Sequence, residues 1–374
     1  MKEIDIHKAF ESEDSIFIDV RSPIEYEESH IPGAINIPLF SNEERAQVGT
    51  TYKIKGQDPA KWLGMQLVSP KIPKLMEIIR NVTEQGKKPI IYCWRGGMRS
   101  KSVATFAEMS GIDVHRLTGG FKHYRQWVVE NLNEQLLPER FIVLHGMTGV
   151  GKTMLLERLQ EKGFPILDLE ECAGHRGSVF GGIGTPVHNQ KTFEALLYHQ
   201  LVRLKGLPIV FMEAESRRIG KAVQPDFLLE AKAKGIHVVL ETTVEIRAGR
   251  IYEEYVIPYL SHEGFKERVL EALSPILKRI DHKTKEMLLE CIEEEDYKQF
   301  IILLLVHYYD PRYQHKLEEY EGPFYHIQVD NLDKAVEELI GITKKHNQEN
   351  MQAPKEAVGK SRLEGAFVDF TRES

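Results

Sequence analysis

One short segment, GMTGVGKT at residues 146–153, constrains the fold of this chain more than any other part of the sequence. It matches the pattern G-x-x-x-x-G-K-[ST] at every fixed position, which chance would do in roughly one chain in a hundred of this length. The apolar run Phe141–His145 precedes it, and a helical pattern carrying Leu155, Leu156 and Leu159 follows it. A strand, a glycine-rich loop and a helix in this order form a phosphate-binding loop, so we expect a parallel α/β sheet around it.

In such a loop the backbone N–H groups hold a diphosphate, Lys152 neutralises its charge, and Thr153 offers a ligand to Mg²⁺. ATP is the usual ligand of this motif, but the loop does not read the group to which the diphosphate is attached. Asp168 and Glu213 lie at or just after expected strand ends, where an acidic partner of the ion could stand. The candidate phosphate-binding residues are Gly146, Thr148, Gly149, Gly151, Lys152 and Thr153.

Two further features of this half are candidates for substrate contact. A glycine-rich stretch short of helix formers follows the strand that ends near Asp168, where a substrate loop would lie. Its first residues are His175, Arg176, Gly177 and Ser178. Arg247 and Arg250 follow an expected strand at 237–240, and they either face phosphates or form surface ion pairs.

The 374 residues are enough for two domains and a tail. Residues 1–130 and 141–345 each alternate apolar strand patterns with helical ones, which predicts two parallel-sheet α/β domains joined by a linker at 131–140. The expected strands are 15–20, 34–37, 89–92 and 114–117 in the first domain, and 141–145, 164–167, 208–212, 237–240 and 325–329 in the second. Residues 262–308 read as a helical subdomain, and 346–374 as a polar tail that we expect to be disordered.

The first domain holds a second candidate site, in the stretch YCWRGGMRS at residues 92–100. Cys93 follows an expected strand, and a helix is expected from Arg99 to Ser110. Glycines that let backbone N–H groups point inward, a helix N-terminus, and the charges of Arg95 and Arg99 would lower the pKa of a thiol and would bind an anion. The alternatives are a buried structural cysteine or a cysteine phosphatase, because Cys93 and Arg99 have Cys-x5-Arg spacing.

The segments DVRSPIEY at 19–26 and HIPGAINIP at 30–38 resemble the two N-terminal signatures of rhodanese domains. This resemblance covers most of residues 1–125, and it implies that Cys93 handles sulfur or a related chalcogen. We expect Asp19 and Arg21 to form a network at a strand end and His30 to shape a turn, so that neither these residues nor Glu25 act in catalysis.

Composition sets limits on compartment and partners. The three cysteines, Cys93, Cys172 and Cys291, are far apart, so we expect neither a disulfide framework nor a zinc site, and a reducing cytoplasm fits best. The sequence has no run of about 18 apolar residues, so we expect no membrane span. The formal net charge of -7 argues against nucleic-acid binding over the whole surface, although it allows a local basic groove.

A rhodanese-like segment ahead of GMTGVGKT, DLEECAGHRGSVFGG and EAESRRIGKAV resembles the bacterial tRNA 2-selenouridine synthases, up to about residue 340. The resemblance implies a transferase that converts 2-thiouridine at the tRNA wobble position to 2-selenouridine, through an S-geranyl-2-thiouridine intermediate. It also implies selenophosphate and geranyl diphosphate as co-substrates, Mg²⁺, no tightly bound cofactor, and an enzyme that supplies selenophosphate as a partner.

Binding of tRNA would need a concentrated basic patch and an aromatic side chain for base stacking. Trp94 is the aromatic candidate, and Arg217, Arg218 and Lys221 are the basic candidates near the phosphate loop. Further basic residues that could contribute are Arg95, Arg99, Lys101, Lys266, Arg268, Lys278, Arg279, Lys283 and Lys285. The rival functions are a phosphatase or ATP-dependent kinase built on the same two anion sites, and a chalcogen carrier without catalytic activity, for which the phosphate loop would be superfluous.

Overall fold

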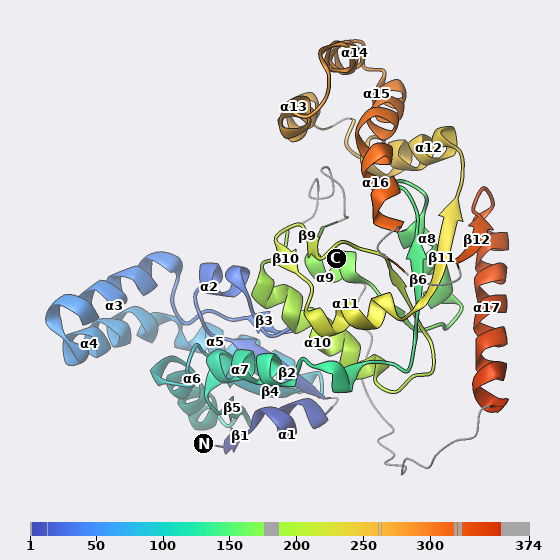
Figure 1. Cartoon of the computed structure of the whole chain (residues 1–374). Coiled ribbons are helices and arrows are strands. Elements are labelled where there is room, and N and C mark those ends of the chain that lie inside the picture. Colours follow the sequence, from blue (N-terminus) through green and yellow to red (C-terminus); the bar gives the residue numbers. More distant parts are fainter. Residues whose placement is uncertain are drawn as a thin grey trace. The chain divides into compact units, whose positions relative to one another are not determined.

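The structure is a computed structural model, and it describes residues 2–12, 14–175, 187–260, 262, 264–317, 320 and 324–352, without the side chains of 314–317 and 347–352. The chain forms two compact units whose main boundary lies between Leu132 and Asn133. Each unit is an α/β structure around a parallel five-stranded sheet (Figure 1).

The sheet of the first unit has the strand order β1-β5-β4-β2-β3, and all of its neighbouring strands are parallel. Its strands are β1 Lys2–Ile4, β2 Ser15–Asp19, β3 Ile35–Asn36, β4 Lys88–Tyr92 and β5 His115–Leu117. Its helices are α1 Ile6–Glu11, α2 Pro23–Glu28, α3 Asn42–Lys55, α4 Gln57–Val68, α5 Ile72–Glu84, α6 Met98–Met109 and α7 Gly120–Asn131.

Residues at the end of β4 alternate between the two faces of this sheet, because successive side chains of a strand point in opposite directions. Ile91 and Cys93 belong to the core that α5 and α6 cover. Tyr92 lies on the other face, with ring centroids 6.4 Å from both Phe17 and Phe121 of α7. The alternation therefore turns the Cys93 side chain toward the α6 face.

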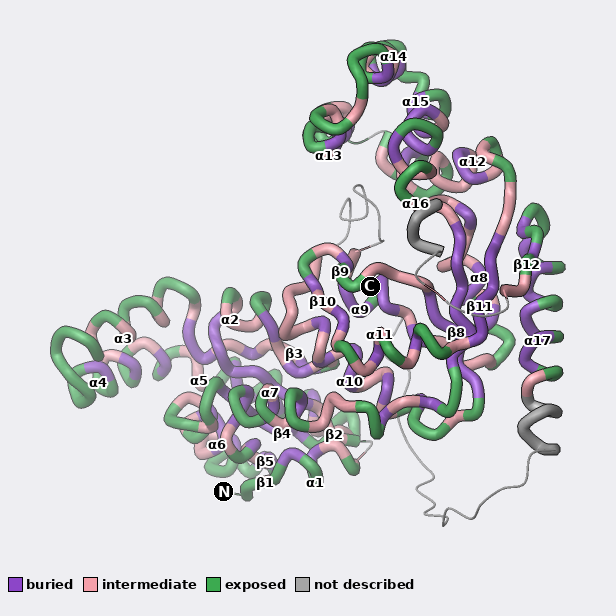
Figure 2. The backbone as a smooth tube through the Cα atoms, viewed as in Figure 1, coloured by how far each residue is buried: buried purple, intermediate pink, exposed green. Residues whose placement is uncertain are grey.

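The sheet of the second unit has the strand order β12-β11-β6-β8-β7, again with all neighbours parallel. Its strands are β6 Phe141–His145, β7 Ile166–Leu167, β8 Val210–Glu213, β11 Ile236–Glu241 and β12 Phe324–Gln328, and a separate antiparallel hairpin is made of β9 Arg218–Ile219 and β10 Ala222–Val223. The helices before the helical subdomain are α8 Lys152–Glu161, α9 Leu169–Ala173, α10 Gln190–Leu204 and α11 Asp226–Ala233, and α17 Leu332–Gln352 is the last helix described. Leucines and valines of α8 and α17 pack on one face of this sheet, and Figure 2 shows β11 buried along its length.

Five helices and a π-helical turn form the helical subdomain of this unit. They are α12 Val244–Tyr255, α13 Phe265–Leu277, α14 His282–Glu293, α15 Tyr297–Leu304, the π-helical turn Leu305–Tyr309, and α16 Asp310–Leu317. The helices α12 to α15 and the π-helical turn share one apolar core, in which Leu273, Leu288 and Ile292 are fully buried. A π-helical turn of this kind often marks a functional site.

The predicted fold class is confirmed, and every expected strand is present with ends that shift by at most two residues. Three strands were not predicted: β1, at the edge of its sheet, and the two-residue strands β9 and β10. The expected tail begins too early, because α17 continues through residues 346–352, while 353–374 lie outside the described residues. Within the part of the chain that the structure describes, no helix combines the length and the apolar character needed to cross a membrane.

Candidate functional site

The phosphate loop runs from the end of β6 to the start of α8, and two of its glycines have a positive φ that favours glycine. Gly149 has φ +79°, and a Cβ at this position would lie 2.7 Å from the side chain of Ile251. Gly151 has φ +96° and precedes the first residue of α8, Lys152. Lys152 donates from Nζ to the carbonyl of Gly146 at 3.3 Å. Its charge is thereby held over the loop, where a phosphate group would bind.

Two arginines of α12 hold the backbone of this loop. Arg247 is buried, forms two hydrogen bonds of 2.8 and 2.7 Å with the carboxylate of Asp310, and also donates to the carbonyl of Thr148 at 3.4 Å. Arg250 donates to the carbonyl of Val150. The sequence left two roles open for Arg247, namely contact with a phosphate or a surface ion pair. The structure shows neither, because Arg247 is buried and stabilises the backbone of the loop.

Carboxylates gather beside the loop from β8 and α9. Thr153 donates from Oγ1 to Glu170 Oε2 at 3.2 Å. Glu213 ends β8 with its side chain fully buried, and neither of its carboxylate oxygens has a hydrogen-bond partner among the described residues. Asp168 caps α9 by accepting from the backbone N–H of Glu171 at 2.7 Å. The sequence predicted Asp168 and Glu213 as acidic partners, and the structure adds Glu170.

These carboxyl groups resist ionisation because they are buried close to one another. Burial, and then the negative charges of Glu215 and Asp168, raise the pKa of Glu170 to about 8 against the opposing effect of Lys152. Burial also raises the pKa of Asp168 to about 6, and it holds the pKa of Glu213 well above the ordinary range. A cation placed among them would lower all three pKa values.

Mg²⁺ requires oxygen ligands, and the side chains beside the loop carry hydroxyl and carboxylate oxygens. Nowhere in the described part of the chain are three or more His, Cys, Asp and Glu side chains arranged to hold a metal ion by themselves. Mg²⁺, however, keeps several water ligands and is commonly bound through one or two carboxylates and the phosphates of a substrate. The unpartnered buried carboxylate of Glu213 and the paired Thr153 and Glu170 fit that kind of site.

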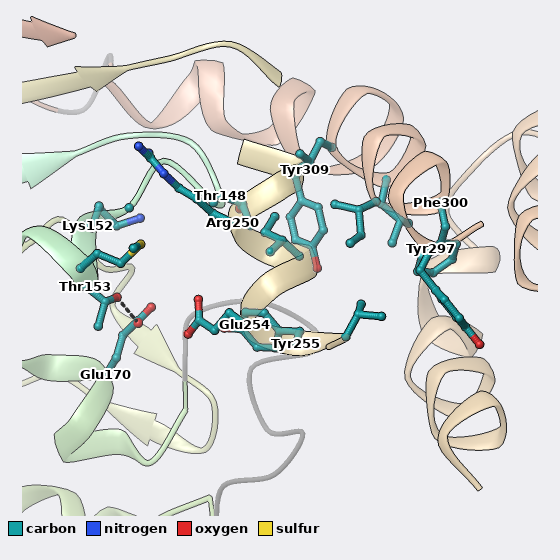
Figure 3. A pocket seen from close by; sticks show the side chains of 18 of the residues that line it. Thr148, Lys152, Thr153, Glu170, Arg250, Glu254, Tyr255, Tyr297, Phe300 and Tyr309 are labelled. Carbon is teal, nitrogen blue, oxygen red and sulfur yellow. Dashed lines mark hydrogen bonds between the residues drawn. The ribbon is translucent and has the colours of Figure 1, made fainter. Parts of the chain in front are cut away.

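The phosphate loop opens into a pocket with about 1150 Å³ of empty space, part of which is continuous with solvent. One end is polar and contains Lys152, Thr153 and Glu170, and the other end is formed by apolar and aromatic side chains of the helical subdomain. Figure 3 shows Tyr309 between these two ends and Phe300 beyond it. The pocket therefore suits a ligand with an anionic head and an apolar tail. Its apolar wall was not predicted from the sequence.

Cys93 lies where β4 ends, and its loop leads into α6, whose N-cap is Gly97. Its side chain is buried, and Sγ lies 3.2 Å from Ser100 Oγ, which itself donates to the carbonyl of Gly97. Ser100 was not predicted from the sequence, although it lies in the first turn of α6. The thiol thus has a hydroxyl neighbour, which could donate to a thiolate only by releasing the carbonyl of Gly97, because it carries a single proton.

The two arginines of this loop differ in their surroundings. Arg95 is exposed. Arg99 forms a bidentate ion pair with Glu25, in which Nη1 donates to Oε2 at 2.5 Å and Nη2 donates to Oε1 at 3.1 Å. Although burial acts to raise it, the pKa of Glu25 is lowered by the hydrogen bond and the charge of Arg99. An anion that is to bind Arg99 must therefore compete with Glu25.

The first turn of α7 packs tightly against the Cys93 loop. The backbone N–H groups of Phe121 and Lys122 donate to the carbonyls of Cys93 and Trp94, at 2.9 and 2.8 Å. Gly120 has φ +60°, and a Cβ at this position would lie only 2.2 Å from the carbonyl oxygen of Cys93. This contact requires glycine and fixes the direction in which the Cys93 loop leaves the sheet.

The residues expected to be structural in the first unit have that role. Asp19 and Arg21 form a buried ion pair at 2.6 Å, and Arg21 also donates to the carbonyl of Ser29. His30 stacks on Tyr26 with ring centroids 3.8 Å apart. The arrangement confirms that these side chains hold the end of β2 and the turn that follows α2.

The candidate tRNA contacts lie in both units. Trp94, 36% exposed, has its ring 5.7 Å from that of Phe121 in the first unit. Arg218 and Lys221 are exposed on the β9–β10 hairpin, and Arg217 just before it pairs with Asp226 at 2.8 Å. Of the helical-subdomain candidates, Lys266 pairs with Glu293, whereas Lys278, Arg279, Lys283 and Lys285 are exposed.

Of the predicted substrate loop, only His175 falls within the described residues, because Arg176, Gly177 and Ser178 do not. His175 packs against Gly220, the turn glycine of the β9–β10 hairpin, whose Cβ would lie 2.8 Å from the imidazole ring. Burial lowers the pKa of His175. The residue that starts the predicted loop therefore contacts the hairpin that carries Arg218 and Lys221.

Comparison with known proteins identifies both units. Residues 139–346 match the tRNA 2-selenouridine synthase AAA domain, and residues 4–126 match the rhodanese-like domain. A tRNA 2-selenouridine synthase of Marinobacter nauticus is 34% identical over 331 residues, which cover 82% of this chain and 89% of the relative. Synthases of the same description from Nitrosomonas europaea and a Sulfurovum species are each 33% identical, over 74% and 80% of this chain and 71% and 88% of their own lengths.

The matches extend through both units, and the phosphate loop and the Cys93 loop each lie inside the unit that the corresponding domain family describes. By its rhodanese-like domain, its P-loop domain and its identity to these relatives, the chain belongs to the tRNA 2-selenouridine synthase family.

Proposed function

We propose that this protein is a tRNA 2-selenouridine synthase that first alkylates the sulfur of a wobble 2-thiouridine with geranyl diphosphate and then replaces the alkylated sulfur by selenium from selenophosphate. The diphosphate binds the loop at 146–153, and the geranyl chain lies in the apolar end of the same pocket. Selenophosphate binds at the Cys93 loop. The names of the relatives support the overall conversion on tRNA.

The proposal rests mainly on the composition of the pocket. A nucleoside would need several hydrogen-bonding partners for its base and ribose, whereas most side chains at the far end of the pocket, such as Val269, Phe300 and Leu304, offer none, and the hydroxyl of Tyr297 is the polar exception beside them. A prenyl chain would gain about 25 cal/mol for each Å² of apolar surface removed from water there. A prenyl diphosphate therefore matches the mainly apolar end of the pocket better than ATP does, and both match the phosphate loop.

In the first step, the uridine sulfur forms a bond to C1 of the geranyl group while the C1–O bond breaks and diphosphate leaves with the electron pair. The proton on N3 of the base is released to water, so the S-geranyl base is neutral. Negative charge develops on the departing diphosphate, and Lys152 with the N–H groups of the loop stabilises it. Mg²⁺, held by Thr153 with Glu170 and Glu213 nearby, would supply further charge neutralisation when bound. Alkylation converts a poor leaving group into a thiol that can depart.

In the second step, selenium forms a bond to C2 of the uridine, and the C2–S bond breaks to release geranyl thiol with a proton. The selenium–phosphorus bond also breaks, and water takes up the phosphoryl group as phosphate, so the overall exchange involves no oxidation or reduction. The N-terminus of α6 and Arg95 favour binding of the selenophosphate anion beside Cys93.

The test separates a prenyl donor from a nucleotide. Purified enzyme is incubated with a thiolated tRNA anticodon stem, geranyl diphosphate and Mg²⁺, with ATP added or omitted. We expect geranylation without ATP, and we expect Lys152→Ala to lower turnover by about 10²–10³-fold, because loss of one electrostatic donor to a developing charge has that effect. The control is Lys162→Ala at the other end of α8, where Lys162 pairs with Glu337. Strict dependence on ATP hydrolysis, or full turnover by Lys152→Ala, would overturn the proposal.

A further inference from the structure

The apolar end of the pocket is built largely by one helix, α15. Its pocket-lining residues are Tyr297, Phe300, Ile301 and Leu304, and Leu305 continues the series into the π-helical turn. Spacings of three and four residues place them on a single helix face. At 1.5 Å per residue, the seven steps from Tyr297 to Leu304 extend about 10 Å along the helix axis. The wall is therefore graded along α15, and its first turn, which carries Tyr297 and Phe300, lies farthest from the phosphate loop.

The end of this wall is closed by packed aromatic rings. Tyr297 and Phe300 are each 4% exposed, and Phe265 of α13, another pocket-lining residue, is 6% exposed. The rings of Phe265 and Tyr297 meet edge to face, with centroids 5.4 Å apart. All three side chains also belong to the core of the helical subdomain. Figure 3 shows Phe300 and Tyr297 at the opposite side of the pocket from Lys152.

We call these three aromatic rings the floor of the pocket. Because the floor is part of a close-packed core, it cannot make room for extra ligand atoms without a cost in free energy. Insertion of additional methylene groups into such a core forces side chains out of their preferred rotamers. A chain that is too short has the opposite defect, because it leaves apolar surface without contacts. The position of the floor therefore decides which chain length fills the pocket when the diphosphate is held at the other end.

We propose that Phe300 and Tyr297, supported by Phe265, form the floor that limits the prenyl group to ten carbons and excludes the fifteen-carbon farnesyl group. This inference rests on the proposed function, because it assigns chain-length specificity to the same pocket. Since the floor and the phosphate loop are at opposite ends, substitution at the floor changes the preferred chain and leaves the diphosphate contacts in place.

The experiment measures kcat/KM for geranyl and farnesyl diphosphates with the same thiolated tRNA stem. Phe300→Leu and Phe300→Ala should raise the farnesyl-to-geranyl ratio by about 10-fold or more, because a few methylene groups in an apolar pocket discriminate by that amount. The matched control is Leu303→Ala, since Leu303 lies on the same helix, is 6% exposed in the same core, and does not line the pocket. It should lower stability without changing the ratio.

A second variant works in the other direction and does not depend on tolerance of a cavity. Val269 of α13 lines the pocket and is 5% exposed, so Val269→Phe should shorten the space and favour the five-carbon dimethylallyl diphosphate over geranyl diphosphate. If the wild-type enzyme uses geranyl and farnesyl diphosphates equally well, the inference that the floor limits chain length is wrong. An unchanged ratio in Phe300→Leu together with an unchanged preference in Val269→Phe would also contradict it. If wild-type enzyme transfers no prenyl group at all, the proposed function itself fails, which is a separate result.

Discussion

The substitution Glu170→Gln should make the Mg²⁺-free protein more stable while it impairs the enzyme. Burial and neighbouring carboxylates raise the pKa of Glu170 from 4.5 to about 8 in the folded state. Below about pH 4.5 the carboxyl group is protonated in both folded and unfolded chains, so it does not affect stability. As the pH rises from there to about 8, only the unfolded chain loses the proton readily, and folding becomes less favourable. At pH 8 the difference corresponds to about 4 kcal/mol, at 1.36 kcal/mol for each pKa unit.

Glutamine keeps the shape of the side chain and an oxygen that can accept from Thr153, but it has no charge to bury. In EDTA at pH 8, Glu170→Gln should therefore raise the free energy of unfolding of the second unit by up to about 4 kcal/mol. The gain should vanish near pH 4. Mg²⁺ should stabilise the wild type more than the variant, because a bound cation offsets the carboxylate charge that glutamine lacks.

All three tryptophans, Trp62, Trp94 and Trp127, lie in the first unit, so tryptophan fluorescence does not report on this change. Hydrogen exchange of peptides that cover β6 and β8 does report on the stability of the second unit. The control is Glu161→Gln, an exposed position near the end of α8. If Glu170→Gln is no more stable than the wild type at pH 8 in EDTA, or if its advantage is the same at pH 4, the assignment of Glu170 as a strained buried acid is refuted.

Three further predictions concern the selenium site and tRNA. Cys93→Ser should abolish selenium incorporation in nucleoside mass spectrometry and leave geranylation intact, whereas Cys291→Ser should have almost no effect; wild-type selenouridine in Cys93→Ser would contradict the assignment. Arg99→Ala should slow single-turnover selenation more than it weakens tRNA binding in filter assays, and the reverse pattern would remove Arg99 from the selenium site. Arg218→Ala and Lys221→Ala should each lower tRNA affinity and reduce the dependence of log K on log salt by about 1; an unchanged salt dependence would mean that the β9–β10 hairpin does not contact the tRNA backbone.

The sheets could be predicted from sequence because their central strands are continuous apolar runs. Phe141–His145 is buried at all five positions, and its bounds are those predicted. The strand β1 was missed because Lys2-Glu3-Ile4 contains one apolar residue and occupies a sheet edge. The hairpin strands β9 and β10 have two residues each, too few to show a periodic pattern.

The candidate sites were predicted in part, where local motifs carry the chemistry. The phosphate loop and the Cys93 loop are continuous in sequence, so their backbone roles could be recognised. The pairing of Arg99 with Glu25 joins residues 74 positions apart, and the contact of Thr153 with Glu170 depends on how α9 follows β7. The apolar pocket was missed because a helix face that lines a ligand site has the same periodicity as one that packs in a core.

In the proposed function, one pocket holds a prenyl diphosphate, with its head at the phosphate loop and its chain in the helical subdomain. The most direct measurement is a crystal structure of the enzyme with Mg²⁺ and an unreactive thio analogue of geranyl diphosphate. We expect diphosphate density against residues 146–153 within reach of Lys152, and a prenyl chain that runs between α12 and α15 and ends at Phe300. A prenyl chain found elsewhere, with the phosphate loop occupied by a nucleotide when ATP is also present, would contradict it.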